Sequence, residues 1–260
     1  MVIVIILIAV SVGLLIAFIW LIKQHFFFKD MLRHFKKDNV VVAGKKGKGK
    51  DVIFQKVINA RKEFYYTNMP TGYGGDFERI KLKDVSCEPN TYREFIEEKV
   101  KKSRRRFKEA CDIYISDAGV YLPSNMDGVL YKQYPSMPIY YALSRQLANH
   151  NIHANVQNFG RLWKALREQA DFFVICKKTI KLPFILITKC ITYEKLQSAE
   201  QELLPIKTRF MNKYSKAEVD QYNATNGEIK VGWIITRKKS IHYDTRAFEN
   251  VIYKEPRIEE

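Results

Sequence analysis

A strand, a glycine-rich turn and a helix follow one another early in the chain, and this order constrains the fold more than any other feature. Residues 40–43 are four small apolar side chains, typical of a buried strand, and residues 52–64 carry an amphipathic helical pattern. Between them, Gly44 is followed after four residues by Gly49 and Lys50, the spacing of a phosphate-binding loop up to its last position. The stretch predicts an α/β fold with a polyphosphate site at the end of this strand.

Phosphate binding explains the residue types in the turn. Glycine lets backbone N–H groups approach a phosphate closely, because it has no Cβ and accepts positive φ, and the following helix N-terminus adds free donors and a favourable dipole. A lysine adds a positive charge that reaches the β- and γ-phosphates. The predicted nucleotide-binding residues are Gly44, Gly47, Lys48, Gly49, Lys50 and Asp51. At this point the alternative is a lysine-rich turn that binds nothing in particular.

The N-terminus has the composition of a membrane anchor. Residues 1–22 contain no charged side chain, and a helix of this length can cross the hydrocarbon core of a bilayer. The segment lacks a basic front, and Trp20 stands where a secretory signal would carry small residues, so we predict an uncleaved transmembrane helix. Basic residues in 23–37 place the bulk of the protein in the cytoplasm by the positive-inside rule. We expect this basic juxtamembrane connector to lie against anionic lipid.

The charge balance favours an anionic partner. The chain has 44 Lys and Arg against 28 Asp and Glu, a net charge of +16, which suits nucleic acid or an anionic membrane surface. Residues 92–109 are predicted to form a strongly basic helix. Its predicted contacts to nucleic acid or lipid are Lys101, Lys102, Arg104, Arg105 and Arg106. The alternative is a merely solvated face.

The middle of the chain alternates strands with helices. Residues 112–117 form an alternating strand that ends in a carboxylate, and the carboxyl ends of such strands hold the Mg²⁺ and water-activating groups of α/β nucleotide sites. Ser116 and Asp117 are the candidates there. Helices at 137–149 and 161–169 alternate with strands at 152–156 and 171–179. We therefore predict a mostly parallel sheet with helices on both faces.

The predicted domains follow from these elements. They are a transmembrane helix (1–22), the connector (23–37), a P-loop NTPase domain (38–180) and a β-rich C-terminal extension (181–260) with strands at 185–193 and 229–236.

Several segments together resemble the zonular occludens toxin-like proteins, the assembly ATPases of filamentous phages. The glycine loop matches as AGKKGKGKD, and ISDAGVYLPSN matches the Walker B end of the family. Residues 140–171 are similar to a helix, a strand ending in a sensor Gln and a helix carrying an Arg, and YDTR at 243–246 resembles a C-terminal tetrapeptide of such proteins. The resemblance covers about residues 38–180, and the tail more faintly.

This resemblance implies an additional-strand ATPase core of the DNA-translocase and packaging type, acting as a ring of identical subunits with ATP and Mg²⁺. By this alignment Lys50 binds phosphate, Asp117 orients or activates the water and Gln157 senses the γ-phosphate. Arg167, or Arg145, would stabilise transition-state charge in a neighbouring subunit.

The sequence also departs from the family pattern. Asp51 replaces a Ser or Thr, and Ser116 replaces the Mg²⁺-directing Asp, so the two residues either exchange their roles at the metal or weaken hydrolysis. The anchor precedes the ATPase, whereas many relatives carry it afterwards.

The implied function is a membrane-anchored motor that extrudes single-stranded DNA through the envelope, with phage coat or envelope assembly proteins as partners. The alternatives are a membrane-tethered scaffold that binds nucleotide or DNA with little hydrolysis, and a plasmid or chromosomal DNA translocase.

Overall fold

An eight-stranded sheet organises the computed structural model, which describes residues 2–80, 112–133, 137–138, 141–142, 151–194 and 229–241. The strands are β1 (Val40–Ala43), β2 (Tyr65–Thr67), β3 (Phe77–Arg79), β4 (Asp112–Ile115), β5 (Asn151–Val156), β6 (Phe172–Lys181), β7 (Ile185–Tyr193) and β8 (Lys230–Arg237). Their order is β3-β2-β4-β5-β1-β6-β7-β8, with parallel pairing from β3 to β6 and antiparallel pairing of β6 with β7 and of β7 with β8. The predicted mostly parallel α/β fold is confirmed.

Strand β5 is inserted between the strand that carries the glycine loop and the strand that carries the acidic end. Val41 of β1 lies opposite Ala154 of β5, and Ile113 of β4 lies opposite Ile152 on the other edge of β5. All four residues of β1 are buried, as expected for a central strand covered on both faces. This insertion is the additional strand that the resemblance implied, and it puts the ends of β1, β5 and β4 next to one another.

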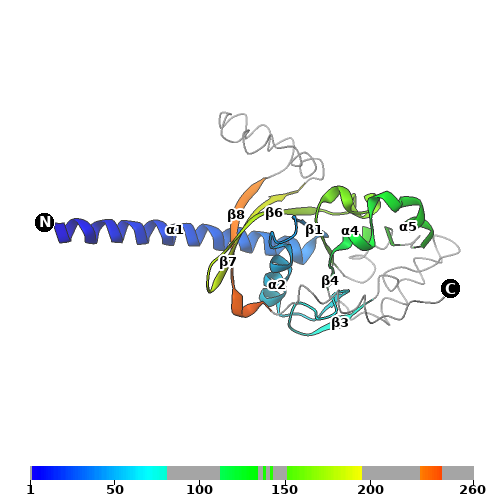
Figure 1. Cartoon of the computed structure of the whole chain (residues 1–260), viewed down its shortest axis with the longest axis horizontal. Helices are drawn as coiled ribbons and strands as arrows, with labels where there is room; N and C mark the ends of the chain where they lie inside the picture. Colours follow the sequence, from blue (N-terminus) through cyan, green and yellow to red (C-terminus); the bar gives the residue numbers. More distant parts are fainter. Residues whose placement is uncertain are drawn as a thin grey trace, which may run out of the picture.

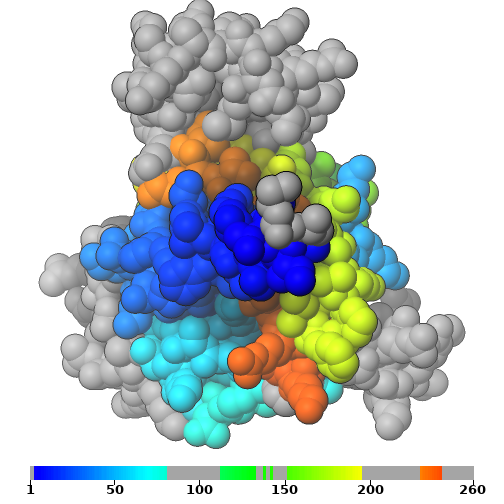
Figure 2. Space-filling model, turned by 90° about the vertical axis from the view of Figure 1, so that its left-hand side faces the viewer, coloured from blue at the N-terminus to red at the C-terminus, as the bar shows by residue number. Residues whose placement is uncertain are grey.

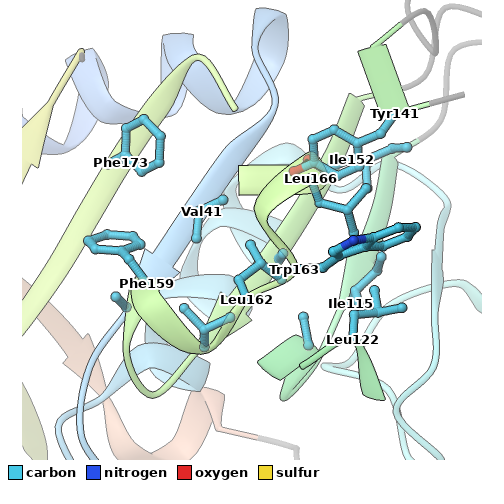
Figure 3. Packing of buried hydrophobic residues seen from close by; sticks show 14 of the residues in the cluster. Val41, Ile115, Leu122, Tyr141, Ile152, Phe159, Leu162, Trp163, Leu166 and Phe173 are labelled. Atoms are coloured by element: carbon cyan, nitrogen blue, oxygen red, sulfur yellow. Dashed lines mark hydrogen bonds between the residues drawn. The ribbon is translucent and has the colours of Figure 1, made fainter. Parts of the chain in front are cut away.

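Helices cover both faces of the sheet (Figure 1). They are α1 (Val2–Lys37), α2 (Lys50–Arg61), α4 (Ala118–Tyr121), α5 (Asp127–Gln133) and α7 (Lys164–Arg167), with 3-10 turns η2 (Ser124–Met126), η3 (Phe159–Arg161) and η4 (Lys238–Ser240). Helix α2 and the end of α1 pack on the face that bears Val40 and Val42. The opposite face, which bears Val41, is covered by η3 and α7, and there the rings of Phe159 and Phe173 lie 5.3 Å apart between centroids (Figure 3).

Two predicted elements differ from the structure. The helix expected at 161–169 is replaced by η3 and the short α7, because the chain between them pairs with another segment. Leu162 forms a β-bridge with Pro123, and Trp163 N donates to the Leu122 carbonyl at 2.8 Å. The sequence also predicts a short strand over residues 79–82; strand β3 begins two residues earlier, at Phe77, and residues 81 and 82 lie outside the described part of the chain.

The N-terminal helix is continuous for 36 residues and projects from the sheet domain (Figure 1). Its first part carries large apolar side chains that are exposed, from Ile3 to Ile22. The helix is long and apolar enough to cross a membrane.

The second part of α1 packs on the sheet, which corrects the expectation that residues 23–37 lie against lipid. Met31 and Phe35 are fully buried in the core beneath α2. Gln24 Oε1 accepts a hydrogen bond from Trp233 N at 2.6 Å, and Lys230 Nζ lies 2.8 Å from Asp30 Oδ2. The apolar side of the connector packs on the sheet, where it covers a face that would otherwise be exposed to water.

The β-rich C-terminal region continues the same sheet. The expected strands at 185–193 and 229–236 are confirmed as β7 and β8. The division proposed at residue 180 falls within β6, so β7 and β8 extend the sheet of the core. The predicted basic helix at 92–109, Arg145 and the tetrapeptide at 243–246 lie outside the described residues.

Candidate functional site

The glycine loop has the backbone geometry that its sequence demands. Gly47 and Gly49 adopt φ of 76° and 86°, in the left-handed region that favours glycine. A Cβ on Gly49 would also lie 2.7 Å from the hydroxyl oxygens of Thr179 and Thr188, which leaves no room for a side chain. Helix α2 begins at the next residue, and Ile53 N donates to the Gly49 carbonyl at 3.1 Å. The loop therefore ends directly in a helix N-terminus with free N–H donors.

Lys50 is the buried cation of the site. Its Nζ lies 2.7 Å from Asp117 Oδ1 and 3.3 Å from Asp51 Oδ2. Burial opposes its positive charge, but the carboxylates of Asp51 and Asp117 outweigh that effect and raise the pKa of Lys50. Lys50 is thus held protonated next to two carboxylates, and an incoming anion would compete with them for its ammonium group.

Asn155 on β5 connects the parts of the site. Its Nδ2 donates to Asp51 Oδ1 at 2.7 Å and its Oδ1 accepts from Asp117 N at 2.7 Å. The same Nδ2 lies 3.3 Å from the Tyr73 hydroxyl and 3.4 Å from Ser116 Oγ. Asn155 is fully buried, so these are the contacts available to its amide. One side chain therefore fixes the helix N-terminus of α2 relative to the end of β4.

The end of β4 is held by a second amide. Asn68 Nδ2 donates to the Ser116 carbonyl at 3.0 Å, and Asn68 Oδ1 accepts from Ser116 N at 2.7 Å. Asp117 then adopts φ of 45°, a left-handed conformation that is uncommon for a residue with a Cβ. This turn directs its carboxylate to Lys50, as the 2.7 Å contact demonstrates.

Sequence reasoning missed Asn155, Asn68 and Tyr73. A polar residue inside the otherwise apolar end of β5 was a usable signal for Asn155, because a buried amide needs hydrogen-bond partners. Asn68 and Tyr73 lie in a loop after β2, and no local pattern relates them to the glycine loop.

Two cavities flank the glycine loop. One has a volume of about 470 Å³, and seven predicted residues line it: Gly47, Gly49, Lys50, Asp51, Ser116, Asp117 and Gln157. The other, of about 570 Å³, is lined by Gly44 and Lys48 together with Gln157 and Arg161. Gln157 is exposed and lines both cavities, and Arg161 Nη1 donates to Gln157 Oε1 at 3.4 Å.

The remaining predicted residues lie apart from these cavities or outside the described part of the chain. Arg167 lines neither cavity, and its Nη1 donates to the Phe159 carbonyl at 3.2 Å. The basic set Lys101, Lys102, Arg104, Arg105 and Arg106 falls outside the described residues.

This arrangement defines a class of protein: a mostly parallel α/β sheet of the P-loop type, with a glycine loop at the end of β1 and a carboxylate at the end of β4. The sequence matches no model of a protein family and no curated protein. Among solved structures, the N-terminal domain of zonular occludens toxin from Neisseria meningitidis is similar with a TM-score of 0.45 and 9% identity, over 82% of this chain and 98% of that one.

Two other solved structures are similar at a comparable level. The genome packaging NTPase B204 from Sulfolobus turreted icosahedral virus 2, in complex with AMPPCP, has a TM-score of 0.41 and 15% identity, over 76% of this chain and 97% of its own. Pif1 helicase from Candida albicans has a TM-score of 0.34 and 14% identity, over 58% of this chain and 38% of its own. Similarities of this size do not assign the chain to a family.

Proposed function

We propose that this protein is a membrane-anchored ATPase motor that drives the assembly and extrusion of filamentous phage. The observation that carries the proposal is the meeting of Lys50, Asp51 and Asp117 in one cavity at the end of the glycine loop. A buried ammonium group, loop glycines with positive φ and a helix N-terminus are the parts that bind a polyphosphate. The sequence resemblance to zonular occludens toxin-like proteins supports phage assembly as the process.

In this proposal, a bound triphosphate accepts hydrogen bonds from the loop amides and replaces Asp117 as the ion-pair partner of Lys50 Nζ. The freed Asp117 carboxylate, on the wall of the same cavity as the loop glycines, then orients or activates the attacking water. Gln157, at the end of β5 and on the wall of the same cavity, senses the γ-phosphate.

The residues present fit a magnesium ion. Asp51 and Ser116 line the same cavity as Lys50, so a carboxylate and a hydroxyl group are both available on its wall. Oxygen ligands of this kind suit Mg²⁺, which would neutralise charge between the β- and γ-phosphates. The geometry supports an exchange of roles, in which Asp51 supplies the carboxylate and Ser116 the hydroxyl.

The wider assembly is also part of the proposal. The exposed apolar part of α1 anchors each subunit in the host inner or cytoplasmic membrane as a single-pass helix, with the C-terminal bulk in the cytoplasm. Subunits form a ring in which Arg167 contributes charge to a neighbour's site. The ring moves single-stranded DNA, and phage coat or envelope assembly proteins are its further partners.

ATP turnover with Mg²⁺ tests the motor directly. We expect Lys50→Ala to lower turnover about 100-fold or more, as removal of a charge-stabilising donor does in other enzymes. Lys132→Ala, on the exposed face of α5, is the matched control and should turn over ATP at the wild-type rate. Equal rates for wild type and Lys50→Ala would remove the motor hypothesis.

One observation favours a second candidate, a tethered scaffold that binds nucleotide with little hydrolysis. The Asp51 carboxylate lies 3.3 Å from Lys50 Nζ, where it repels an incoming phosphate. For a scaffold, nucleotide binds to the wild type without turnover, and Asp51→Ser creates turnover by restoring the usual hydroxyl. For the proposed motor, Asp51→Ser leaves Ser116 without a carboxylate partner at the metal and lowers turnover.

The third candidate, a plasmid or chromosomal DNA translocase, shares the core. Neighbouring genes distinguish a DNA translocase from the phage-assembly motor, because small single-span coat proteins beside a replication initiator favour phage assembly.

Contacts of Arg104, Arg105 and Arg106 with DNA would show as a shallower salt dependence of single-strand binding when these residues are neutralised.

A further inference from the structure

An apolar hairpin tip with a basic collar stands at the end of strands β6 and β7. Phe184 is 81% exposed and Leu182 is 40% exposed, the largest apolar groups of the turn between the two strands. The surrounding side chains of Lys181, Arg237, Lys238 and Lys239 are exposed, and we name these six residues the hairpin-tip patch. Residues 177–189 and 229–241, which carry the patch, contain no Asp or Glu.

The patch has a fixed shape. Leu182 N donates to the Ile185 carbonyl at 2.9 Å and closes the turn. Lys238 N donates to the Phe184 carbonyl at 3.0 Å and ties η4 to the tip. The apolar and basic groups are therefore presented side by side by paired backbone.

The patch faces the direction in which α1 leaves the domain. Figure 1 shows the β6–β7 turn and η4 at the end of the sheet from which α1 projects. In Figure 2, which views the molecule from that end, the blue helix points outward with the yellow-green hairpin and the orange segment after β8 beside it. The contact of Gln24 with Trp233, at 2.6 Å, holds α1 against β8 in this orientation.

We propose that the hairpin-tip patch is a second membrane contact that docks on the anionic surface of the bilayer crossed by α1. Because α1 would pass through the membrane on this side, the patch would meet the headgroups, so the inference rests on the anchoring in the proposed function. Exposed Phe184 and Leu182 would enter the boundary between headgroups and acyl chains. The lysines would be attracted by the negative surface potential of the leaflet.

This contact would fix the orientation of the ATPase on the membrane. A single helix leaves a domain free to tilt, whereas a helix and a second contact hold it at two places. The basic side chains suit an anionic partner. The apolar pair favours a lipid surface over a free phosphate, because a free phosphate has no apolar surface for Phe184 to contact.

The test uses the full chain in vesicles of phosphatidylcholine and phosphatidylglycerol with brominated acyl chains, which quench tryptophan. The variant Phe184→Trp reports on the tip after subtraction of the wild-type emission. Val129→Trp is the matched control, because Val129 is 51% exposed on α5, at the end of the domain away from the projecting helix (Figure 1). Trp20, read as wild type minus Trp20→Phe, reports separately on insertion of α1.

Support for the patch is quenching of the added Phe184→Trp emission, as expected for a ring in the headgroup–acyl boundary, with no quenching for Val129→Trp. Changing Lys181, Lys238 and Lys239 to Gln should weaken docking about fivefold for each lysine, and only in vesicles that contain phosphatidylglycerol.

Three results would overturn the inference. If Trp20 is quenched and the Phe184→Trp emission behaves like the control, α1 is anchored and the patch does not dock. If the Phe184→Trp emission is blue-shifted and unquenched, protein covers the tip. If Trp20 itself is unquenched, the anchoring in the proposed function fails together with the patch.

Discussion

Replacing Asn155 by Asp is the sharpest test of how the site is assembled. The variant retains the oxygen that accepts from Asp117 N, but it puts a carboxylate oxygen where Nδ2 now lies 2.7 Å from Asp51 Oδ1. Two charges at that distance repel by about 6 kcal/mol at an effective dielectric constant of about 20. The new carboxyl therefore takes up a proton, and its pKa in the folded state rises well above its usual value of about 3.9.

The sign of the pH effect follows from this raised pKa. The folded state binds a proton that the unfolded chain releases above about pH 4, so stability is lost as pH rises, by about 1.4 kcal/mol per pH unit. The expected deficit relative to wild type is about 5 kcal/mol at pH 7.5 and about 1.5 kcal/mol at pH 5. These values correspond to a fall in Tm of about 10–20 °C and about 3–6 °C for a protein of this size.

Thermal unfolding of the full chain in detergent, followed by circular dichroism at both pH values, measures the effect. Asn158→Asp is the matched control, because the Oδ1 of Asn158 accepts from Gly160 N at 2.9 Å and a carboxylate retains that bond at a partly exposed position. Its Tm should change by no more than about 2 °C. An equal Tm deficit for Asn155→Asp at both pH values would refute the contact with Asp51.

Three further predictions test other parts of the structure. Gly49→Ala should lower nucleotide affinity about tenfold or more in calorimetric titration, because φ of 86° strains a residue with a Cβ and its Cβ would meet two hydroxyl oxygens; Gly128→Ala, whose Cβ meets nothing within 4 Å, should bind normally. Complete burial lowers the pKa of His153 and outweighs the opposing contact with Asp112, so the stability present above about pH 6.5 is lost as pH falls. The variant His153→Gln should therefore lose less Tm than wild type between neutral and acidic pH. Parallel plots of Tm against pH for the two proteins would contradict this prediction. Gly232→Val should detach α1 from β8, because a Cβ there would overlap the ring of Phe27; unchanged resistance to limited proteolysis would argue against that contact.

The local part of the site could be predicted from sequence because it is encoded in consecutive residues. The apolar run of β1, the glycines and Lys50 form one continuous stretch, and glycine spacing reports directly on backbone conformation. Asp117 was predicted by the same logic, as the polar end of an apolar strand. Its 2.7 Å contact with Lys50 joins residues 67 positions apart in the chain.

The fold class followed from periodicity, but short elements did not. Alternating strands and helices predicted the mostly parallel sheet, since each βαβ crossover favours parallel pairing. The helix expected at 161–169 was wrong, because a backbone hydrogen bond from Trp163 to Leu122 competes with continuation of the helix. Such a bond depends on a distant segment and has no local signal.

The sequence by itself determined the geometry of the glycine loop, the long apolar N-terminal helix and the alternation of strands with helices, because these depend on neighbouring residues and on their period. Only the tertiary structure decided which side chains complete the site. Strand β5 enters between β1 and β4, and this insertion brings Asn155 to Asp51 and Ser116. Tertiary packing also turned the apolar side of residues 23–37 onto the sheet and presented Phe184 beside the projecting helix, because both depend on surfaces that exist only after the strands have paired.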